Sequence, residues 1–324
     1  MIALPPLGMG CAGIGNLYRA VSDEVADETV AAALAGGIGY FDVAPHYGFG
    51  LAETRLGRAL AAHDPEGRAL VSTKVGRLLQ PTDSAAAERH GFVDATPLEP
   101  VFDYSADGVL RSVASSRDRL RRERIDLLLA HDLGTLTHGH EAARHIEDFL
   151  FGGYAAMKRL RDEGTVSAIG VGVNEIAVCH DLLDRAELDV ILLAGRYTLL
   201  EQDDALSLFE RCARAGTQLV IGGPYNSGIL VEGSRAASHF NYAAPPAAVV
   251  ARVAELERAC AAFNVPLAAA ALQFPLRQPT VACVIPGLVG AAQVEATLRY
   301  AALPIPEALW TACRPALSAR GQAA

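Results

Sequence analysis

Lysine is nearly absent from this chain of 324 residues: of its 28 basic residues, only Lys74 and Lys158 are lysines. Lys158 lies in an Arg- and Glu-rich helical stretch, residues 156–163, and is predicted to be solvated surface. Lys74 instead ends an apolar run, and burying an ammonium group costs several kcal/mol unless it is paired. The scarcity of lysine therefore singles out Lys74 as a residue that needs a specific partner.

The sequence also lacks paired cysteines and long apolar runs. None of the six cysteines forms a CxxC pair, which predicts free, mostly buried thiols in a reducing compartment. No basic residue precedes Arg19, so the start of the chain has no charged region typical of a signal peptide. No stretch approaches the roughly 20 apolar residues of a membrane span. We therefore expect a cytoplasmic protein.

The balance of charge is acidic, with 28 Lys and Arg against 37 Asp and Glu and a formal net charge of −9. This excess argues against nucleic acid or an anionic membrane as the main partner. The expected partner is a small molecule, and the sequence does not indicate an oligomeric state.

Several motifs with known chemistry are missing or stand in the wrong context. No Gly-x-Ser-x-Gly elbow and no P-loop occurs, which disfavours a serine hydrolase or an NTPase. The run Gly8–Gly13 fits G-x-G-x-x-G, but prolines precede it and no helical period begins before about Ser22, so we interpret it as a Gly-rich strand and loop. No cysteine lies near the histidines His138, His140 and His145, and we interpret their segment as the start of a surface helix. No metal site is predicted.

Short apolar runs alternate with longer segments of helical period, among them residues 141–163 and 201–215, which is typical of βαβ units. The eight runs are Leu7–Cys11, Gly39–Phe41, Ala69–Thr73, Ile125–Ala130, Ser167–Val173, Val190–Ala194, Gln218–Ile221 and Val281–Ile285. Eight such units predict an α/β fold, a (β/α)₈ TIM barrel forming one domain over residues 1–324. A doubly wound sheet is the alternative. Long strand-to-helix loops are expected at 76–104 and 224–246, and an extra helical tail after Pro304.

Four of these runs lead into a polar side chain: Asp42, Lys74, His131 and Asn174. In a barrel the carboxyl ends of the strands form the active-site face, so these side chains would converge on one mouth. Each has an ordinary structural interpretation when taken singly, because an Asp caps turns, a His is often hydrogen-bonded core and an Asn caps helices. Their arrangement as a set favours a site.

Tyr47 follows Asp42 by five residues, in a loop marked by Pro45 and Gly48. A free tyrosine has a pKa of about 10, so proton exchange near neutrality needs a cation that stabilises the phenolate. Lys74 would supply the cation, Asp42 would fix the lysine, and His131 would polarise the reacting oxygen. The set predicts general acid/base chemistry without a metal or a covalent nucleophile.

These residues carry a resemblance to a known family. The stretch Gly39-Tyr-Phe-Asp-Val-Ala-Pro-His-Tyr-Gly, with Glu53 after it, and Ile125-Asp-Leu-Leu-Leu-Ala-His resemble the aldo-keto reductases over nearly the whole chain. The resemblance implies a barrel that binds an extended nicotinamide cofactor across its mouth. It also implies that Tyr47 is the proton donor or acceptor and that Asn174 binds the carboxamide.

Further segments, including 101–105, 193–202 and 222–230, resemble the aldose 1-dehydrogenase branch, of the L-fucose, D-threo-aldose and L-galactose type. The branch implies oxidation of the anomeric C1 hydroxyl of a cyclic aldose, of L-fucose, L-galactose or D-arabinose type, to a lactone. Pyridoxal 4-dehydrogenase and an NADPH-dependent aldehyde or ketone reductase stay open, as does a non-catalytic regulatory subunit. Phe92, Phe102 and Tyr104 favour a flat substrate, whereas the polar residues Asp94, Glu99, Asp103 and Asn241 favour a sugar.

The cofactor contacts depart from the wider family. A glutamine near Ala194 and an aromatic ring near Gly222 are missing, so Arg196, Tyr197 or Tyr225 are expected to substitute. The resemblance implies six further contacts, at Pro224, Asn226, Gly228, Leu230, Pro286 and Gly287. Segment 287–298 has no basic residue to hold a 2′-phosphate, which predicts NAD over NADP, with Gln293 near the adenosine ribose.

Overall fold

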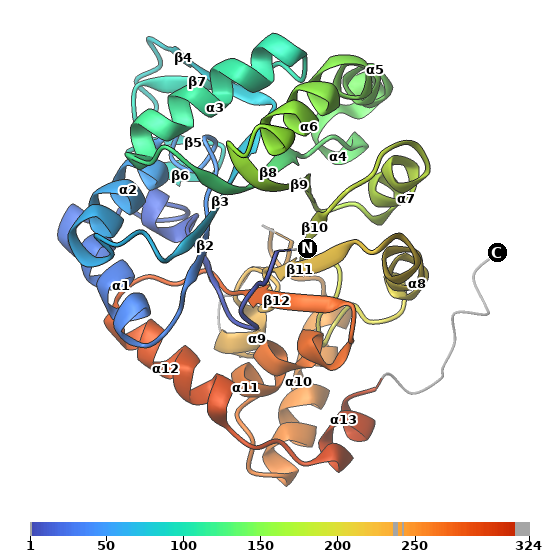
Figure 1. The fold of residues 1–324 in the computed structure, drawn as a ribbon. Helices are drawn as coiled ribbons and strands as arrows, with labels where there is room; N and C mark the ends of the chain where they lie inside the picture. Colours follow the sequence, from blue (N-terminus) through green and yellow to red (C-terminus); the bar gives the residue numbers. More distant parts are fainter. Residues whose placement is uncertain (1, 236–238, 242, 315–324) are drawn as a thin grey trace.

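The computed structural model describes residues 2–235, 239–241 and 243–314. Its centre is a ring of eight parallel strands (Figure 1). The strands are β1 (Met9–Gly10), β2 (Tyr40–Asp42), β3 (Leu70–Val75), β8 (Ile125–His131), β9 (Val166–Val173), β10 (Val190–Ala194), β11 (Gln218–Gly222) and β12 (Val281–Ile285). They are hydrogen-bonded in chain order. Parallel bridges from Leu7 to Val284 and from Gly10 to Gly287 link the first strand to the last. The predicted barrel is confirmed.

Helices lie outside the ring of strands (Figure 1). They are α1 (Asp23–Ala35), α2 (Leu51–His63), α3 (Ala106–Leu120), α4 (Thr135–His138), α5 (Ala142–Asp148), α6 (Tyr154–Asp162), α7 (Ile176–Arg185), α8 (Leu206–Ala215), α9 (Ile229–Glu232), α10 (Ala247–Ala262), α11 (Leu267–Gln273), α12 (Ala291–Ala302) and α13 (Glu307–Cys313). Short 3-10 turns occur at η1 (Gly13–Gly15), η2 (Gly139–Glu141) and η4 (Phe274–Arg277), and a π-helical turn at η3 (Phe149–Gly153).

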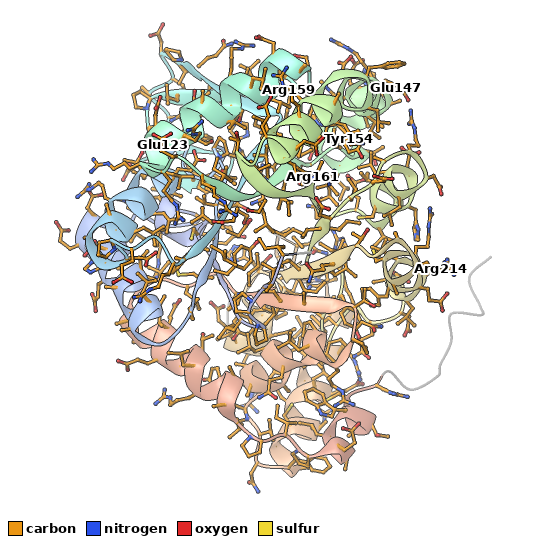
Figure 2. All side chains as sticks on the ribbon, in the orientation of Figure 1. Glu123, Glu147, Tyr154, Arg159, Arg161 and Arg214 are labelled. Atoms are coloured by element: carbon orange, nitrogen blue, oxygen red, sulfur yellow. The ribbon has the colours of Figure 1, made fainter. Side chains whose placement is uncertain are left out.

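Side chains fill the inside of the barrel (Figure 2). The interior cluster includes Tyr40, Leu127, Leu129 and Cys283, all fully buried. Larger apolar clusters occupy the layer between strands and helices, because each strand alternates its side chains between the two faces. The C-terminal helices have a cluster of their own, which includes Trp310, as expected for a tail packed on the barrel. The barrel is therefore a rigid, filled support for the loops at its mouth.

The two long loops contain structure that the sequence did not predict. In the first, β4 (Arg77–Pro81) pairs antiparallel with β7 (Leu98–Phe102), and β5 (Glu88–Arg89) pairs with β6 (Phe92–Val93). The second loop carries the short helix α9. The helix expected over residues 141–163 is divided into α5, η3 and α6.

All six cysteines are free and buried, as predicted. Over the described residues, no single helix is both long and apolar enough to cross a membrane. The bent pair Ala247–Ala262 and Leu267–Arg277, which turns through 98°, passes that test only jointly and only by length and composition.

Candidate active site

The strand ends gather the predicted residues around one cavity of about 640 Å³ at the carboxyl end of the barrel. Tyr47, Lys74, His131 and Asn174 line it, and Asp42 lies directly behind Lys74. The sequence prediction that these strands share one mouth therefore agrees with the geometry.

Lys74 is the centre of a dense network inside the barrel. Its ammonium donates to both carboxylate oxygens of Asp42, at 2.8 and 3.0 Å, and to the backbone oxygen of Val43 at 3.0 Å. Ser72 donates to Asp42 Oδ1 at 2.7 Å, and its own hydroxyl lies 2.9 Å from that of Tyr40. Ser72 was missed from the sequence, although it shares with Lys74 the inward face of the same strand.

Tyr47 completes this network, because Lys74 Nζ also donates to the Tyr47 hydroxyl at 3.2 Å. Two glycines allow its loop to approach η1. A Cβ at Gly48, where φ is +63°, would lie 2.3 Å from the backbone oxygen of Gly15, and a Cβ at Gly15 would lie 2.9 Å from the Tyr47 backbone. The backbone at Tyr47 and Gly48 therefore packs directly on the backbone of η1, and this contact fixes the point from which the Tyr47 side chain leaves the main chain.

Lys74 stays charged in spite of its burial. Burial alone would lower its pKa, but attraction to Asp42 and Tyr47, together with the hydrogen bonds to both, raises the pKa above its ordinary value. The side chains of Lys74 and Asp42 are only 2% and 3% exposed. The site thus holds a permanent positive charge beside the phenol.

His131 ends β8 and packs edge-on against Tyr47, with ring centroids 6.0 Å apart and planes at 83°. Burial, with the charges of Arg77 and Lys74, holds the pKa of His131 well below its ordinary value, so the ring is neutral. Tyr104 donates a hydrogen bond to the His131 backbone oxygen at 2.6 Å. His131 Nδ1 is buried and has no hydrogen-bond partner among the described residues.

The adjacent Asp132 also lines the cavity. Arg77 Nη2 donates to Asp132 Oδ2 at 2.6 Å, and both side chains are largely buried. Neither residue was singled out from the sequence. The signal was available, since Asp132 directly follows the strand-end histidine.

Aromatic rings form another wall of the cavity. His46 packs edge-on against Phe92 at 5.4 Å, and burial first, then Arg77 and His90, lowers the pKa of His46 to about 2. Tyr18 and His239 come from separate loops, stack at 5.3 Å and also line the cavity. The site thus combines an uncharged aromatic wall with a strongly polar floor, formed by Lys74, His131 and Asp132.

Most loop residues expected to meet a substrate lie elsewhere. Phe92 lines the cavity, whereas Phe102 covers Arg77 and Tyr104 is buried beneath the strand end. The four polar candidates do not line the cavity in the part of the chain that the structure describes. Glu99 pairs with Arg89 and Asp103 with Arg111, Asn241 accepts from Arg196, and the Asp94 N–H donates to the Ala87 backbone oxygen. Whether any of the four contacts a substrate stays a prediction.

Of the predicted cofactor residues, Asn174 is the one that lines the cavity. Arg196 Nε donates to the Asn174 backbone oxygen at 2.7 Å, and Arg196 Nη1 pairs with Glu201 at 3.2 Å. Arg196 therefore positions the backbone of Asn174 rather than facing the cavity itself.

Tyr197 and Tyr225, which were expected to replace the missing nicotinamide-holding ring, both lie away from the cavity. Tyr197 packs in the layer between strands and helices, 4.6 Å from Phe209 and 5.0 Å from Phe274. Tyr225 packs against the C-terminal helices, and Leu230 is fully buried there. Burial of apolar ring area decides these orientations, and neither tyrosine lines the cavity.

The remaining candidates lie in the turns after β11 and β12. Pro224 and Pro286 are buried, Gly287 is exposed, and Gly228 is the N-cap residue directly before α9, with φ of +111°. Gln293 is exposed in the first turn of α12, where its Oε1 accepts the Val289 N–H at 2.9 Å. Asn226 is only 2% exposed, and its Nδ2 and Oδ1 have no partner among the described residues.

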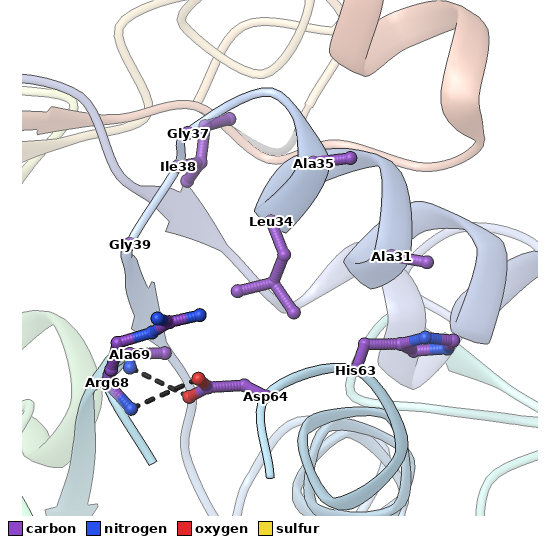
Figure 3. A pocket seen from close by; sticks show the side chains of 10 residues that line it. All are labelled: Ala31, Leu34, Ala35, Gly37, Ile38, Gly39, His63, Asp64, Arg68 and Ala69. Atoms are coloured by element: carbon purple, nitrogen blue, oxygen red, sulfur yellow. Dashed lines mark hydrogen bonds between the residues drawn. The ribbon is translucent and has the colours of Figure 1, made fainter. Parts of the chain in front are cut away.

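A second hollow of about 560 Å³ lies at the opposite end of the barrel, where β2 and β3 begin (Figure 3). Its carboxylate, Asp64, accepts from the backbone N–H groups of Arg68 and Ala69 at 3.1 and 2.8 Å. This carboxylate caps the turn before β3, so the hollow has a structural explanation.

The three histidines of segment 138–145 were expected to be surface residues, and for His138 this was wrong. His138 is buried, with its Nε2 3.0 Å from the Tyr104 hydroxyl, whereas His140 is exposed. Burial and the neighbouring His145 lower the pKa of His138 to about 4. In the part of the chain that the structure describes, no three His, Cys, Asp or Glu side chains are grouped so as to hold a metal.

Comparison with known proteins agrees with this geometry. Residues 6–317 match the model of the aldo/keto reductase family. The chain belongs to the aldo/keto reductase family. Pyridoxal 4-dehydrogenase of Microbacterium luteolum is 39% identical, covering 97% of this chain and 94% of the relative. D-threo-aldose 1-dehydrogenase of a Pseudomonas species is also 39% identical, covering 95% and 93%.

Among solved structures, an aldo-keto reductase of Bacillus halodurans superimposes with a TM-score of 0.71 at 23% identity. The match covers 95% of this chain and 90% of that one, and it supports the fold. This aldo-keto reductase is thus an oxidoreductase, and its family uses nicotinamide cofactors.

The residues present fit such a group. The buried Asn226 amide offers a donor and an acceptor that the described chain leaves unsatisfied, and leaving such groups unpaired costs about 1–3 kcal/mol. A polar ligand across the loops after the strands would satisfy them. Asn174 stands at the cavity beside Lys74 and His131, where an amide can bind the amide of a nicotinamide.

Proposed function

We propose that this aldo-keto reductase is an NAD-dependent aldose 1-dehydrogenase, which oxidises the anomeric C1 hydroxyl of a cyclic aldose to the lactone. The observation that carries the proposal is the contact between the buried Lys74 ammonium and the Tyr47 hydroxyl at 3.2 Å, with Asp42 behind it. This arrangement suits reversible proton transfer to an alcohol oxygen and needs no metal ligand set.

Tyr47 is the proposed general base in the oxidation. Lys74 favours the phenolate, since an opposite charge at hydrogen-bond distance stabilises the charged form. The phenolate takes the proton of the C1 hydroxyl, while the electron pair of the C1–H bond leaves as hydride and the C1–O bond becomes a carbonyl. A bound nicotinamide ring would supply the acceptor for that hydride. A positioned general base contributes about 10²- to 10⁴-fold to such a step.

His131 is the proposed donor that orients the C1 oxygen. A neutral imidazole carries one N–H, and at the buried, partnerless Nδ1 that N–H would be unsatisfied. The proton is therefore better placed on Nε2, which lies 3.4 Å from Asp132 Oδ2, at the cavity. The Nε2–H can then point at the reacting oxygen and polarise the developing carbonyl.

The substrate class rests on the relatives and on the cavity together. One relative at 39% identity is named D-threo-aldose 1-dehydrogenase, and a polar floor of Lys74, His131 and Asp132 suits a polyhydroxylated ring. We therefore propose sugars of the L-fucose, L-galactose or D-arabinose type.

The preference for NAD is proposed from the turn after β12. Segment 287–298 has no basic side chain, and the exposed Gln293 caps that turn, so nothing in this segment offers the charge that a 2′-phosphate needs. Asn174, Asn226 and the backbone around Gly228 and Gly287 are the proposed cofactor contacts.

The test is the absorbance of reduced nicotinamide with purified protein, NAD or NADP, and L-fucose, L-galactose, D-arabinose, D-glucose or pyridoxal. We expect reduction of NAD by one or more of the three proposed sugars, and their relative kcat/KM names the preferred substrate. Turnover of pyridoxal alone, or NADPH-driven aldehyde reduction alone, would overturn the sugar assignment and keep the chemistry of the site.

Pyridoxal oxidation is the second candidate. A relative at 39% identity is named pyridoxal 4-dehydrogenase, and the aromatic wall of His46 and Phe92 would suit a flat ring. The same assay separates the two candidates, because pyridoxal and the sugars are compared at equal enzyme concentration.

A further inference from the structure

Asp132 adopts a backbone conformation that turns its side chain toward the cavity. It directly follows His131, and in a regular strand the two side chains would point to opposite faces. Its φ of +49° lies in the left-handed region, uncommon for residues other than glycine. Its N–H donates to the Gly172 backbone oxygen at 2.9 Å, which holds this turn at the strand end.

The Asp132 carboxylate is held from one side only. Arg77 Nη2 donates to Oδ2 at 2.6 Å, and the Arg77 guanidinium is fixed over the Phe102 ring at 5.2 Å. Among the described residues, no hydrogen bond occupies Oδ1. The Asp132 side chain is 19% exposed and lines the cavity, so Oδ1 is open there to accept a hydrogen bond from a ligand.

The position of Asp132 relative to His131 limits which ligand group it can meet. Asp132 Oδ2 lies 3.4 Å from His131 Nε2, the atom proposed to contact the reacting oxygen. An oxygen that accepts from Nε2 would share that nitrogen as a neighbour with the carboxylate, which lies within about 3.4 Å of it. In a cyclic aldose the hydroxyl on C2 lies next to the oxygen on C1 and is separated from it by a similar length.

We propose that Asp132 is a specificity residue that accepts a hydrogen bond from the C2 hydroxyl of the sugar, with Arg77 holding the carboxylate in place. This inference rests on the proposed function and adds a requirement to it. An ionised carboxylate only accepts, so it rewards a hydroxyl at C2 and is left unpaired by a methylene. A site built to bind a hydroxyl rejects analogues that lack it much more strongly than an apolar pocket does.

The test pairs Asp132→Asn with substrates that have or lack the C2 hydroxyl. A hydrogen bond to a charged group contributes about 1.5–3 kcal/mol, so wild-type kcat/KM should fall about 10- to 150-fold from the best aldose to its 2-deoxy analogue. In the Asn variant, kcat/KM for the parent sugar should fall by a similar factor and that for the 2-deoxy sugar should change little. Equal losses for both sugars, or no loss for either, would refute the role of Asp132.

Asp189→Asn is the matched control. Asp189 Oδ2 pairs with Arg161 Nη1 at 2.7 Å, in an Asp–Arg pair before β10 at the opposite end of the barrel; Arg161 is labelled in Figure 2. This variant should keep the wild-type ratio between the two sugars. A changed ratio would mean that the loss of any Asp–Arg pair alters the discrimination between the two sugars. That outcome would also contradict the proposed role of Asp132.

A second measurement needs no variant and decides the matter if Asp132→Asn does not fold. The lactone product and its 2-deoxy analogue are compared as inhibitors of the wild-type enzyme, and the 2-deoxy lactone should bind at least about 10-fold more weakly. Equal inhibition would refute the inference. Absence of aldose oxidation by the wild type would instead refute the proposed function, so the two failures are distinguishable.

Discussion

The ammonium of Lys74 lies against the phenol of Tyr47 in two ways at once: Nζ is 3.2 Å from the hydroxyl oxygen and 4.7 Å from the ring centroid. The lysine comes from the carboxyl end of β3 and the tyrosine from the loop after β2. Proton transfer at the mouth therefore depends on a charge that is buried in the sheet and held there by Asp42.

Replacement of Tyr47 by Phe removes the hydroxyl and keeps the ring. We expect kcat to fall by at least about 10³-fold, because the general base and its contact with Lys74 are both lost. Binding of NADH, followed by the change in its fluorescence, should be nearly unchanged. Turnover close to that of the wild type would show that Tyr47 is not the proton-transfer group.

Lys74→Met leaves Asp42 without its counter-ion in the barrel interior. Removal of one member of a buried ion pair costs about 3–5 kcal/mol, so the midpoint of urea unfolding should fall markedly, and activity should be lost. Lys158→Met is the control, since Lys158 is the other lysine of the chain and is exposed on α6. Its free energy of unfolding should stay within about 0.5 kcal/mol of the wild-type value. Similar losses in both variants would contradict the proposed role.

Stability should fall as the pH is lowered from 7 to 5.5. In the folded protein the pKa of His131 lies well below its ordinary value of 6.5, and that of His46 is about 2. Above pH 6.5, His131 and His46 are neutral in both the folded and the unfolded protein, so their contribution to the free energy of unfolding is fully present. Below it the unfolded chain takes up protons that the folded chain refuses, and His131 alone should cost about 1.4 kcal/mol per pH unit.

The free energy of unfolding, measured in urea at pH 7.5, 6.5 and 5.5, checks this slope. His131→Asn should flatten it, whereas His140→Asn should retain it, because His140 is 93% exposed. A slope that is the same in all three proteins would mean that His131 is not the group that titrates on unfolding.

The sequence predicted the strands well because each is a short apolar run bounded by turn residues. Val190–Ala194 and Val281–Ile285 have the predicted bounds, and the strand expected to end at Thr73 continues to Val75. The helix expected over 201–215 begins only at Leu206. Thr198 Oγ1 accepts from the backbone N–H of Leu200 and Glu201, and such local hydrogen bonds compete with the helix.

The candidate site was predictable wherever a polar residue at a strand end is sufficient to place the side chain at the mouth of the barrel. Asp42, Lys74 and His131 meet because parallel strands end at the same edge of the barrel. The orientation of Asp132 depends on its positive φ, which reverses the strand alternation and cannot be derived from a period of two. Tyr197 lies three residues beyond β10, and only the packing against Phe209 and Phe274 shows which way its ring faces.

Gln293→Arg is expected to bring NADP into use. The residue is exposed in the first turn of α12, close to the turn Gly287–Gly290, where the proposed NAD contact lies. An Arg there would offer charge-assisted hydrogen bonds to a 2′-phosphate, which are roughly twice as strong as neutral ones. We expect kcat/KM for NADP to rise by about 10-fold or more, as one added charge-assisted hydrogen bond of 1.5–3 kcal/mol allows.

The same substitution also removes the hydrogen bond from the Val289 N–H to Gln293 Oε1, so the loss of the cap must be separated from the gain of charge. Gln293→Ala loses the cap without adding charge, and it should lower kcat/KM for NAD and NADP alike. Initial rates with both cofactors at a fixed sugar concentration distinguish the cases. If Gln293→Arg and Gln293→Ala give the same ratio of NADP to NAD use, the 2′ position of the ribose lies elsewhere, because an arginine at the ribose would change that ratio and an alanine would not.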